Sequence, residues 1–428
     1  MSEKRATVQI VSIGDELLIG QVVNTNASWM ATLLTEKGFH VLKIITISDK
    51  SEEIFSILEE VSGRSDIVLI TGGLGPTKDD TTKDVICRYF SSKLVFSEEV
   101  FSNIERLFYK RGISVSETNR KQAEFPDKAT IIPNSIGTAP GLWLEQNNTL
   151  FVFMPGVPFE MKEMMGSKLI PLLSEKFHPD TFIFRTIHIQ GIPESSLSDM
   201  LEKWERGLVS ENLSLAYLPQ PGILRLRISG TGSDKALLET KIQNKIEKLL
   251  KIIPDDIFGY DNDSLESVIG KLLMDRSATV SLAESCTGGY ISHLMTSVPG
   301  SSKYFLGSLI AYSNEIKINE LGIDKRIFRK EGAVSKEVVE QMATGILRKT
   351  GSDYSVATSG IAGPDGGSAE KPVGTIWIAV ASHSGVFSQK YIFGKMRDVN
   401  IKRATATALN MLRKVILQVP GYNSGSEI

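Results

Sequence analysis

The sequence predicts an α/β protein in which two α/β segments are separated by a small α+β module. Three observations support this prediction: a length of 428 residues, β-branched apolar runs that alternate with helical stretches near both ends, and a change of rhythm between them. The length exceeds that of one ordinary core, so we expect two or three domains. Strands that alternate with helices are typical of βαβ units and a largely parallel sheet.

The first segment, expected over residues 1–175, begins with an apolar strand at Val8–Ile13. Ala27–Lys37 has apolar residues at helical spacing and predicts a helix. Val41–Thr46 and Ile67–Ile70 are β-branched runs separated by helical sequence, and they predict two further strands. The order strand, helix, strand, helix, strand indicates an α/β domain.

The middle module, expected over residues 180–255, combines a strand-like run (184–191), a short helix (195–204), two strands around Pro221-Gly222 and a long amphipathic helix. Pro254–Ser264 is rich in turn residues, and we expect it to be a linker. A third domain is expected over residues 262–420. Its apolar runs lie at 278–283, 305–311, 354–358 and 374–381.

Composition excludes several classes of protein. Hydrophobic residues make up 41% and charged residues 23% of the chain, a balance typical of a globular protein, and no stretch is long and apolar enough to span a bilayer. A formal net charge of -2 gives no general attraction for nucleic acid. Two cysteines and the absence of an export signal indicate the cytoplasm, and five histidines without metal spacing argue against zinc. A carboxylate site for a hard cation stays open.

The strongest local motif is the sequence AESCTGG, which places Ser285 at a strand-to-helix turn. A hydroxyl at such a turn lies at the open edge of the sheet, and free N–H groups at the helix start can stabilise an oxyanion. A serine nucleophile needs a base, and no histidine is positioned to supply one. Tyr312 and Lys317 in AYSNEIK are the alternatives. Cys286 is a rival nucleophile, although an ordinary buried cysteine is its more frequent role.

A third loop, SGIAGPDGG, begins at Ser359 after another strand, and its glycines would let the backbone approach a ligand closely. Any one of these loops alone is compatible with a tight turn that binds nothing. Three such loops on one sheet edge favour a functional site.

These motifs, together with GAVS at Gly332–Ser335, resemble the C-terminal domain of the CinA family. The resemblance implies nicotinamide-mononucleotide deamidase activity without a cofactor, with Ser285 as nucleophile, Tyr312 and Lys317 as its activating partners, and Ser359 assisting at the oxyanion. Threonine is common in the family where this chain has Ser359. The resemblance also implies a set of substrate-binding positions: Thr287, Gly288, Gly289, Gly360, Gly363, Arg397 and Arg403. Arg397 and Arg403 match positions used for the substrate phosphate; which of them binds it stays open, and Arg403 also fits a solvated helix arginine.

The first segment has glycine loops after two predicted strands, GDELL and TGGLGPTKDD. Such loops form phosphate cradles, and nearby carboxylates could hold a divalent cation against the phosphate. The same acids could simply cap helices. The candidate phosphate-binding residues are Gly72, Gly73, Gly75 and Asn24, and the candidate metal ligands are Asp15, Glu16, Asp79 and Asp80.

This segment resembles the three-layer molybdopterin-binding fold, and its motifs NRKQA, GTAPG and MPGVPFEMK are similar to the CinA N-terminal domain. The resemblance implies a metal-dependent ADP-ribose pyrophosphatase that releases AMP and ribose 5-phosphate, with Glu160 joining the acidic residues. The middle module resembles the KH-like connector of the family. It lacks a GXXG clamp for RNA, so we interpret it as a spacer or a dimer element.

Two hypotheses follow. The first is a cytoplasmic pyridine-nucleotide salvage enzyme, expected to be a homodimer, whose partners are nicotinamide mononucleotide and ADP-ribose rather than nucleic acid or membrane. The second is a pterin- or nucleotide-binding accessory protein for competence or cofactor assembly, without turnover. If Lys317 is the base, it must be neutral at working pH, which requires burial or a nearby cation.

Overall fold

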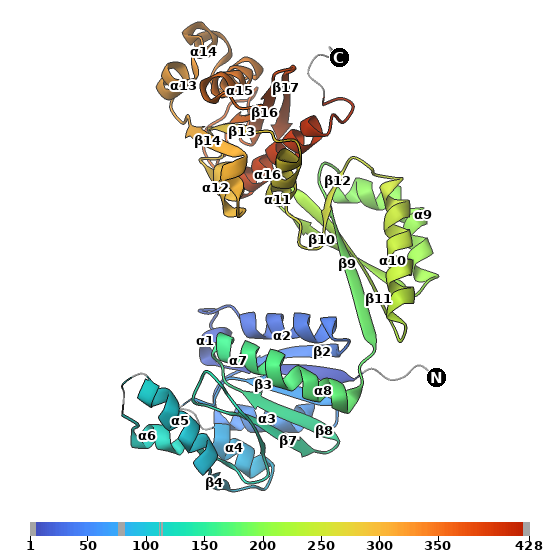
Figure 1. The fold of residues 1–428 in the computed structure, drawn as a ribbon, viewed down its shortest axis with the longest axis vertical. Helices are drawn as coiled ribbons and strands as arrows, with labels where there is room; N and C mark the ends of the chain where they lie inside the picture. Colours follow the sequence, from blue (N-terminus) through green and yellow to red (C-terminus); the bar gives the residue numbers. More distant parts are fainter. Residues whose placement is uncertain (1–5, 76–81, 111, 113, 423–428) are drawn as a thin grey trace. The chain divides into compact units, whose positions relative to one another are not determined.

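The computed structural model describes residues 6–75, 82–110, 112 and 114–422 (Figure 1). Contacts divide the chain into two compact units. The first runs through Ile183 and includes Thr231–Leu238; the second contains Phe184–Gly230 and everything from Glu239 onward. Most of the middle module therefore belongs to the same unit as the C-terminal domain. Among the described helices, none has the length and apolarity that a bilayer crossing requires.

The N-terminal domain is built on a six-stranded sheet of order β2-β1-β3-β8-β7-β6. In it β2, β1, β3 and β8 are parallel, β7 pairs antiparallel with β8, and β6 pairs antiparallel with β7. Its strands, with the two of a separate small sheet, are β1 (Thr7–Ile13), β2 (His40–Ile47), β3 (Ile67–Thr71), β4 (Leu94–Phe96), β5 (Glu124–Pro126), β6 (Thr130–Ile132), β7 (Gly141–Gln146) and β8 (Thr149–Met154). Its helices are α1 (Asp15–Leu18), α2 (Thr25–Glu36), α3 (Ser51–Val61), α4 (Thr82–Tyr89), α5 (Glu98–Lys110), α6 (Glu117–Lys121), α7 (Pro158–Met164), a π-helical turn (Met165–Leu169) and α8 (Ile170–Phe177).

Two hydrophobic cores, one on each face, make this domain three-layered. Residues of α2, α7 and α8 pack on one face of the central strands, and residues of α3 and α4 pack on the other (Figure 1). β3 and β8 are buried throughout, which is why their sequences are continuously apolar rather than alternating. The expected α/β three-layer architecture of this segment is confirmed.

The middle module has one four-stranded sheet of order β10-β11-β9-β12 and two helices. Its elements are β9 (Thr181–Ile189), α9 (Glu194–Val209), β10 (Leu213–Gln220), β11 (Ile223–Gly232), α10 (Lys235–Leu250) and β12 (Ile257–Tyr260). The expected linker at Pro254–Ser264 is wrong, because β12 lies inside it and pairs antiparallel with β9. Ile257 and Phe258 are buried in this pairing, so a non-local contact overrides the local turn composition.

The C-terminal domain has a five-stranded sheet of order β14-β13-β15-β16-β17, in which β14, β13 and β15 are parallel. One face packs against α11, α12 and α16, and the other against α13 and α15. Its strands are β13 (Val280–Glu284), β14 (Phe305–Ile310), β15 (Tyr354–Gly360), β16 (Thr375–Ser382) and β17 (Gly385–Ile392). Its helices are α11 (Leu265–Asp275), α12 (Tyr290–Ser297), α13 (Asn314–Leu321), α14 (Lys325–Glu331), α15 (Lys336–Thr350) and α16 (Arg397–Ile416), with a 3-10 turn at Ser301–Lys303.

Candidate functional site

The three motif loops of the C-terminal domain begin at the carboxyl ends of adjacent parallel strands. β13 ends at Glu284, β14 at Ile310 and β15 at Gly360. Because parallel strands end at the same edge of a sheet, the loops that follow them come together there. The structure thus brings Ser285, Lys317 and Ser359 to one edge.

Ser285 and Lys317 are in direct contact at this edge. The Nζ of Lys317 lies 3.1 Å from the Oγ of Ser285, and the two side chains are both buried. Side chains alternate between the faces of a strand, so Ser285 lies on the same face as Ala283, which packs against α13 and α15. Lys317 comes from α13, so the contact joins the turn after β13 to the helix covering that face.

The amine of Lys317 has two other close partners. Nζ donates to the carbonyl of Ala311 at 2.7 Å and to the carbonyl of Tyr312 at 3.0 Å. Burial lowers the pKa of Lys317 to about 8, since removal from water disfavours the charged form. A neutral amine has two N–H groups and one lone pair. With both N–H groups on the two carbonyls, the lone pair is left for the Ser285 hydroxyl.

The start of α12 differs from the expectation. The helix start was expected to offer free N–H groups, but those of Gly289, Ile291 and Ser292 donate to the carboxylate of Glu284 at 3.0, 3.2 and 2.8 Å. The hydroxyl of Ser292 also donates to this carboxylate, which is fully buried. The negative charge satisfies the helix N-terminus internally, so this end of α12 has little capacity left for an oxyanion.

Two amides of the turn itself remain available. Within the described part of the chain, the N–H groups of Cys286 and Thr287 donate to no acceptor on another residue. An amide that directly follows a nucleophile is well placed to stabilise an oxyanion formed on the attacked carbonyl. Glu284 was not singled out from the sequence. The signal was an acidic residue before a Gly-Gly helix start, where carboxylates act as caps.

The side chains around Ser285 have defined partners. The hydroxyl of Thr287 is hydrogen-bonded to that of Thr358 at 2.8 Å, and both are buried. Ser359 donates its hydroxyl to the carbonyl of Ala333 at 2.8 Å, which links β15 to the GAVS motif. Burial raises the pKa of the Cys286 thiol to about 12, so the thiolate needed for a cysteine nucleophile is disfavoured.

Tyr312 and Arg397 meet at the solvent side of the site. Arg397 donates from Nη2 to the Tyr312 hydroxyl at 3.1 Å and from Nη1 to the Gly363 carbonyl at 3.0 Å. Arg397 is the first residue of α16 and is exposed, as is Tyr312. Arg403 lies about 9 Å further along the helix, where its backbone contacts the turn at Gly222. The geometry therefore associates Arg397, rather than Arg403, with the glycine loop.

Glycine is needed at the predicted positions for different physical reasons. Gly288 and Gly289 have φ of 61° and 96°, which other residues rarely adopt, and they form the tight turn before α12. Gly360 lies against β16, where a Cβ would come within 2.5 Å of the Ile376 side chain. Gly363 has φ of 91° and offers its carbonyl to Arg397.

Asn400 is a site residue that the sequence did not reveal. It is fully buried on α16, and its Nδ2 donates to the carbonyls of Ala362 at 2.9 Å and Gly394 at 2.8 Å. These two bonds fasten the glycine loop to the segment that leads into Arg397. An asparagine in an amphipathic helix gives no distinctive signal from sequence alone.

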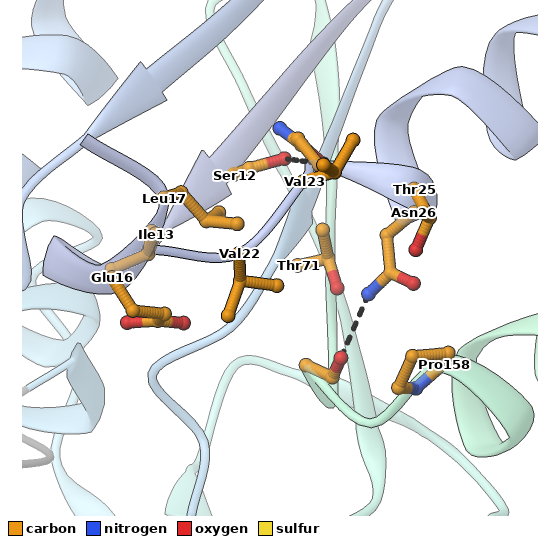
Figure 2. A pocket seen from close by; sticks show the side chains of 12 residues that line it. Ser12, Ile13, Glu16, Leu17, Val22, Val23, Thr25, Asn26, Thr71 and Pro158 are labelled. Carbon is orange, nitrogen blue, oxygen red and sulfur yellow. Dashed lines mark hydrogen bonds between the residues drawn. The ribbon is translucent and has the colours of Figure 1, made fainter. Parts of the chain in front are cut away.

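The N-terminal domain has a cavity of about 150 Å³ at the carboxyl ends of β1 and β3 (Figure 2). Asn26 donates to the Gly156 carbonyl at 2.7 Å and joins the start of α2 to the PGVP motif. Asn24 caps α2 by accepting from the Ala27 N–H, and its amide also contacts Thr46. The residues that line the cavity are Ser12, Ile13, Glu16, Leu17, Val22, Val23, Asn24, Thr25, Asn26, Thr71, Gly156 and Pro158.

Gly72 and Gly73 approach this region closely, since a Cβ on Gly72 would lie 2.3 Å from the Ile13 carbonyl and one on Gly73 would lie 2.1 Å from the Thr82 hydroxyl. Both have positive φ, of 107° and 69°. Gly75 ends the described part of this loop, outside the lining of the cavity. These glycines therefore meet a requirement of the backbone, and their role in phosphate binding stays a prediction.

The predicted acidic residues are only partly described. Asp79 and Asp80 lie outside the described residues. Glu16 lines the cavity, Asp15 is exposed on α1, and Glu160 accepts from Asn134 at 2.7 Å. Within the described residues, no three His, Cys, Asp or Glu side chains are grouped to hold a metal. The divalent cation thus stays a prediction.

Comparison with known proteins covers the whole chain. The CinA C-terminal domain matches residues 262–416, the damage-inducible protein CinA KH domain residues 184–259, and the probable molybdopterin binding domain residues 9–175. CinA-like proteins of Flavobacterium psychrophilum and Cytophaga hutchinsonii are 44% and 41% identical, each over 96% of this chain and 98% of the relative. A solved competence/damage inducible protein from Agrobacterium tumefaciens is 37% identical, with a TM-score of 0.34, over 35% of this chain and 92% of that structure. Extensive identity over nearly the full length confirms the expected resemblance, and the chain belongs to the CinA family.

Proposed function

We propose that the C-terminal domain hydrolyses the carboxamide of nicotinamide mononucleotide to give nicotinic acid mononucleotide and ammonia. The contact between the buried amine of Lys317 and the hydroxyl of Ser285 carries this proposal. A lysine with a pKa of about 8 is partly neutral near physiological pH, and a neutral amine within hydrogen-bond distance of a hydroxyl can act as its base.

The first half-reaction forms an acyl-enzyme. Lys317 accepts the proton of Ser285 as Oγ attacks the carboxamide carbon, and the carbonyl oxygen becomes an oxyanion that the Cys286 and Thr287 amides stabilise. Lys317 then gives its proton to the departing nitrogen as the C–N bond breaks, and ammonia leaves. An ester between Ser285 and the pyridine carboxyl group remains.

The second half-reaction is hydrolysis of this ester. Lys317, again neutral, accepts a proton from water as the water oxygen attacks the ester carbonyl. Collapse of the intermediate returns the proton to Ser285 and releases the carboxylic acid, which ionises. Lys317 acts twice, so its proton balance closes over one turnover.

The substrate phosphate is assigned to Arg397. Its guanidinium lies at the solvent side of the site, and beside its bonds to Gly363 and Tyr312 its Nε donates to nothing among the residues that the structure describes. Arginine suits phosphate because its planar fork matches two phosphate oxygens. Asn400 holds the glycine loop and the segment that leads into Arg397 in place.

Ammonia release from nicotinamide mononucleotide tests this function. The purified chain is compared with Ser285→Ala and Cys286→Ala, with circular dichroism to show that each is folded. We expect turnover in the wild type and in Cys286→Ala and none in Ser285→Ala. A folded wild type without turnover would contradict the deamidase function and favour a nucleotide-binding accessory protein. Loss of turnover only in Cys286→Ala would indicate that Cys286, rather than Ser285, is the nucleophile.

We infer as a second activity that the N-terminal domain cleaves the phosphoanhydride of ADP-ribose. The observation in favour is the cavity at the ends of β1 and β3, beside glycines with positive φ (Figure 2). A divalent cation would supply charge neutralisation and an activated water there. AMP release from ADP-ribose, measured with and without EDTA, tests it. Binding of ADP-ribose without cleavage in the presence of Mg²⁺ or Mn²⁺ would contradict the activity and favour a binding role.

A further inference from the structure

The N-terminal domain contains a second and larger cavity, of about 250 Å³, that no assigned activity uses. It lies between α5, the segment from β6 to β7, and the π-helical turn. It shares no lining residue with the cavity of Figure 2. A hollow of this size admits a small organic molecule and excludes a folded macromolecule.

Two cations reach this cavity from separate parts of the chain. Arg106 comes from α5 and Lys168 from the π-helical turn. Neither has a carboxylate partner among the described ion pairs. Glu99 is the one acidic residue in the lining, so the lining carries one net positive charge.

Arg106 has a side-chain partner on its own helix. Its Nη2 donates to the side chain of Asn103 at 2.7 Å, and Asn103 in turn donates to the carbonyl of Asn134 at 3.1 Å. Asn134 is buried, and its side chain ties the segment 134–139 together by bonds to Ile136, Gly137 and Ala139. This chain of hydrogen bonds orients the exposed guanidinium of Arg106, and its Nε and Nη1 donate to nothing within the described residues.

Two hydroxyl groups in the lining could also bind a ligand. Ser135 and Thr138 line the cavity, and in the described part of the chain their hydroxyls have no hydrogen-bond partner. Val100, Ile131 and Pro140 supply apolar walls. The cavity therefore offers an arginine fork, a lysine, two hydroxyls without partners among the described residues, and one carboxylate.

We propose that this cavity binds a small phosphorylated sugar. Arg106 and Lys168 together carry the charge that a phosphate dianion requires, and the arginine fork matches two of its oxygens. Ser135 and Thr138 can donate to the sugar or accept from it, and the Glu99 carboxylate accepts from sugar hydroxyls. The cavity shares no lining residue with the one proposed for ADP-ribose cleavage, although Asn134 also donates to Glu160. The site is read out by binding alone.

Isothermal titration calorimetry on the full chain tests this site with ribose 5-phosphate, ribose and inorganic phosphate. We expect ribose 5-phosphate to bind at least tenfold more tightly than either fragment. The double variant Arg106→Gln with Lys168→Gln should lose at least tenfold in affinity, while Lys37→Gln, which removes an exposed lysine outside the cavity, should bind like the wild type.

Both proposed hydrolytic sites could also bind ribose 5-phosphate, so Arg397→Gln and Asn24→Ala, which changes the lining of the other cavity, are titrated in parallel. Retained binding in Arg397→Gln and in Asn24→Ala and lost binding in the folded double variant would support the cavity. Unchanged affinity in the double variant, no heat at millimolar ribose 5-phosphate, or equal affinity for inorganic phosphate would each overturn the proposal. Because no turnover is measured, an inactive pyrophosphatase or deamidase would leave this result unaffected.

Discussion

The pKa of Lys317 predicts a specific pH dependence of the deamidase. With a pKa of about 8, roughly a tenth of the enzyme has a neutral lysine at pH 7 and roughly nine tenths at pH 9. The proposed base works only when neutral, so kcat/KM should rise about tenfold between these pH values with an inflection near 8. The phosphate of the substrate titrates near pH 6 and does not contribute to this rise.

Two substitutions distinguish the role of Lys317 as a base from the effect of its positive charge. Lys317→Arg keeps a cation that cannot deprotonate, and Lys317→Met removes the ionisable group while keeping an unbranched chain. Each should lower kcat by about 10²–10⁴-fold, the usual contribution of a positioned general base, and abolish the inflection near pH 8. Lys325→Met, which removes an exposed lysine on α14, is the control and should keep the wild-type profile.

The same pKa makes a prediction for stability. The folded value, about 8, lies below the ordinary 10.5, so between these values the unfolded chain binds more protons than the folded chain and stability rises with pH. Below pH 8 the charged amine is buried at a cost of about 3–4 kcal/mol, since the pKa falls from 10.5 to about 8 and a tenfold change in an equilibrium is worth about 1.4 kcal/mol. Between pH 7.5 and 9.5 about 2 kcal/mol of this cost should disappear in the wild type and not in Lys317→Met.

Urea unfolding of both proteins at several pH values measures this difference. Taking the difference between variant and wild type removes the contributions of all other groups, which titrate alike in both. A gap in unfolding free energy that stays constant from pH 7.5 to 9.5, or a kcat/KM profile without an inflection between pH 7 and 9, would refute the lowered pKa. Without it, Lys317 would be a structural lysine and the serine would need another base.

Three further predictions concern residues that hold the site together. Glu284→Gln should lower the free energy of unfolding by about 1–2 kcal/mol, because a neutral amide caps α12 less well than a carboxylate, and thermal unfolding that matches the wild type would contradict this role. Asn400→Leu should raise KM for nicotinamide mononucleotide several-fold with a smaller change in kcat, since it frees the segments beside Arg397; steady-state kinetics decide, and a loss confined to kcat would count against it. Asp256→Ala should destabilise the second unit by up to about 3 kcal/mol because it leaves buried Lys414 unpaired, and a denaturant midpoint equal to that of the wild type would disprove this.

The α/β architecture could be predicted because the local sequence pattern is enough to identify most of its strands. Val8–Ile13 and Ile67–Ile70 are rich in β-branched apolar residues, as expected for strands buried on both faces, and β1 and β3 include them. β12 could not be predicted, because Ile257–Tyr260 becomes a strand only by pairing with β9, more than 60 residues earlier in the chain. Turn composition describes the local preference of that segment and says nothing of a distant edge that is free to pair.

The residues of the site could be predicted where the parallel strands determine their position. Strands β13, β14 and β15 bring Ser285, Lys317 and Ser359 to one edge, and the requirement that Lys317 be buried or lie near a cation followed from chemistry alone. Whether the fold meets that requirement depends on packing around α13, which the sequence does not show. Glu284 was hidden for the opposite reason: its partners lie only five to eight residues away, but the adjacent serine offered a more direct chemical role.

Helix α16 links the C-terminal site to the middle module within one compact unit. Its first residue, Arg397, reaches the glycine loop, while near its other end Arg413 donates to the carbonyls of Asp255 and Ile257, and Asn410 donates to Gln190. These polar groups are buried, so separating the module from α16 would leave them unsatisfied at about 1–3 kcal/mol each. A module fastened in this way restrains the helix that carries the proposed phosphate ligand. The middle module is therefore better understood as a support for the deamidase domain than as a spacer.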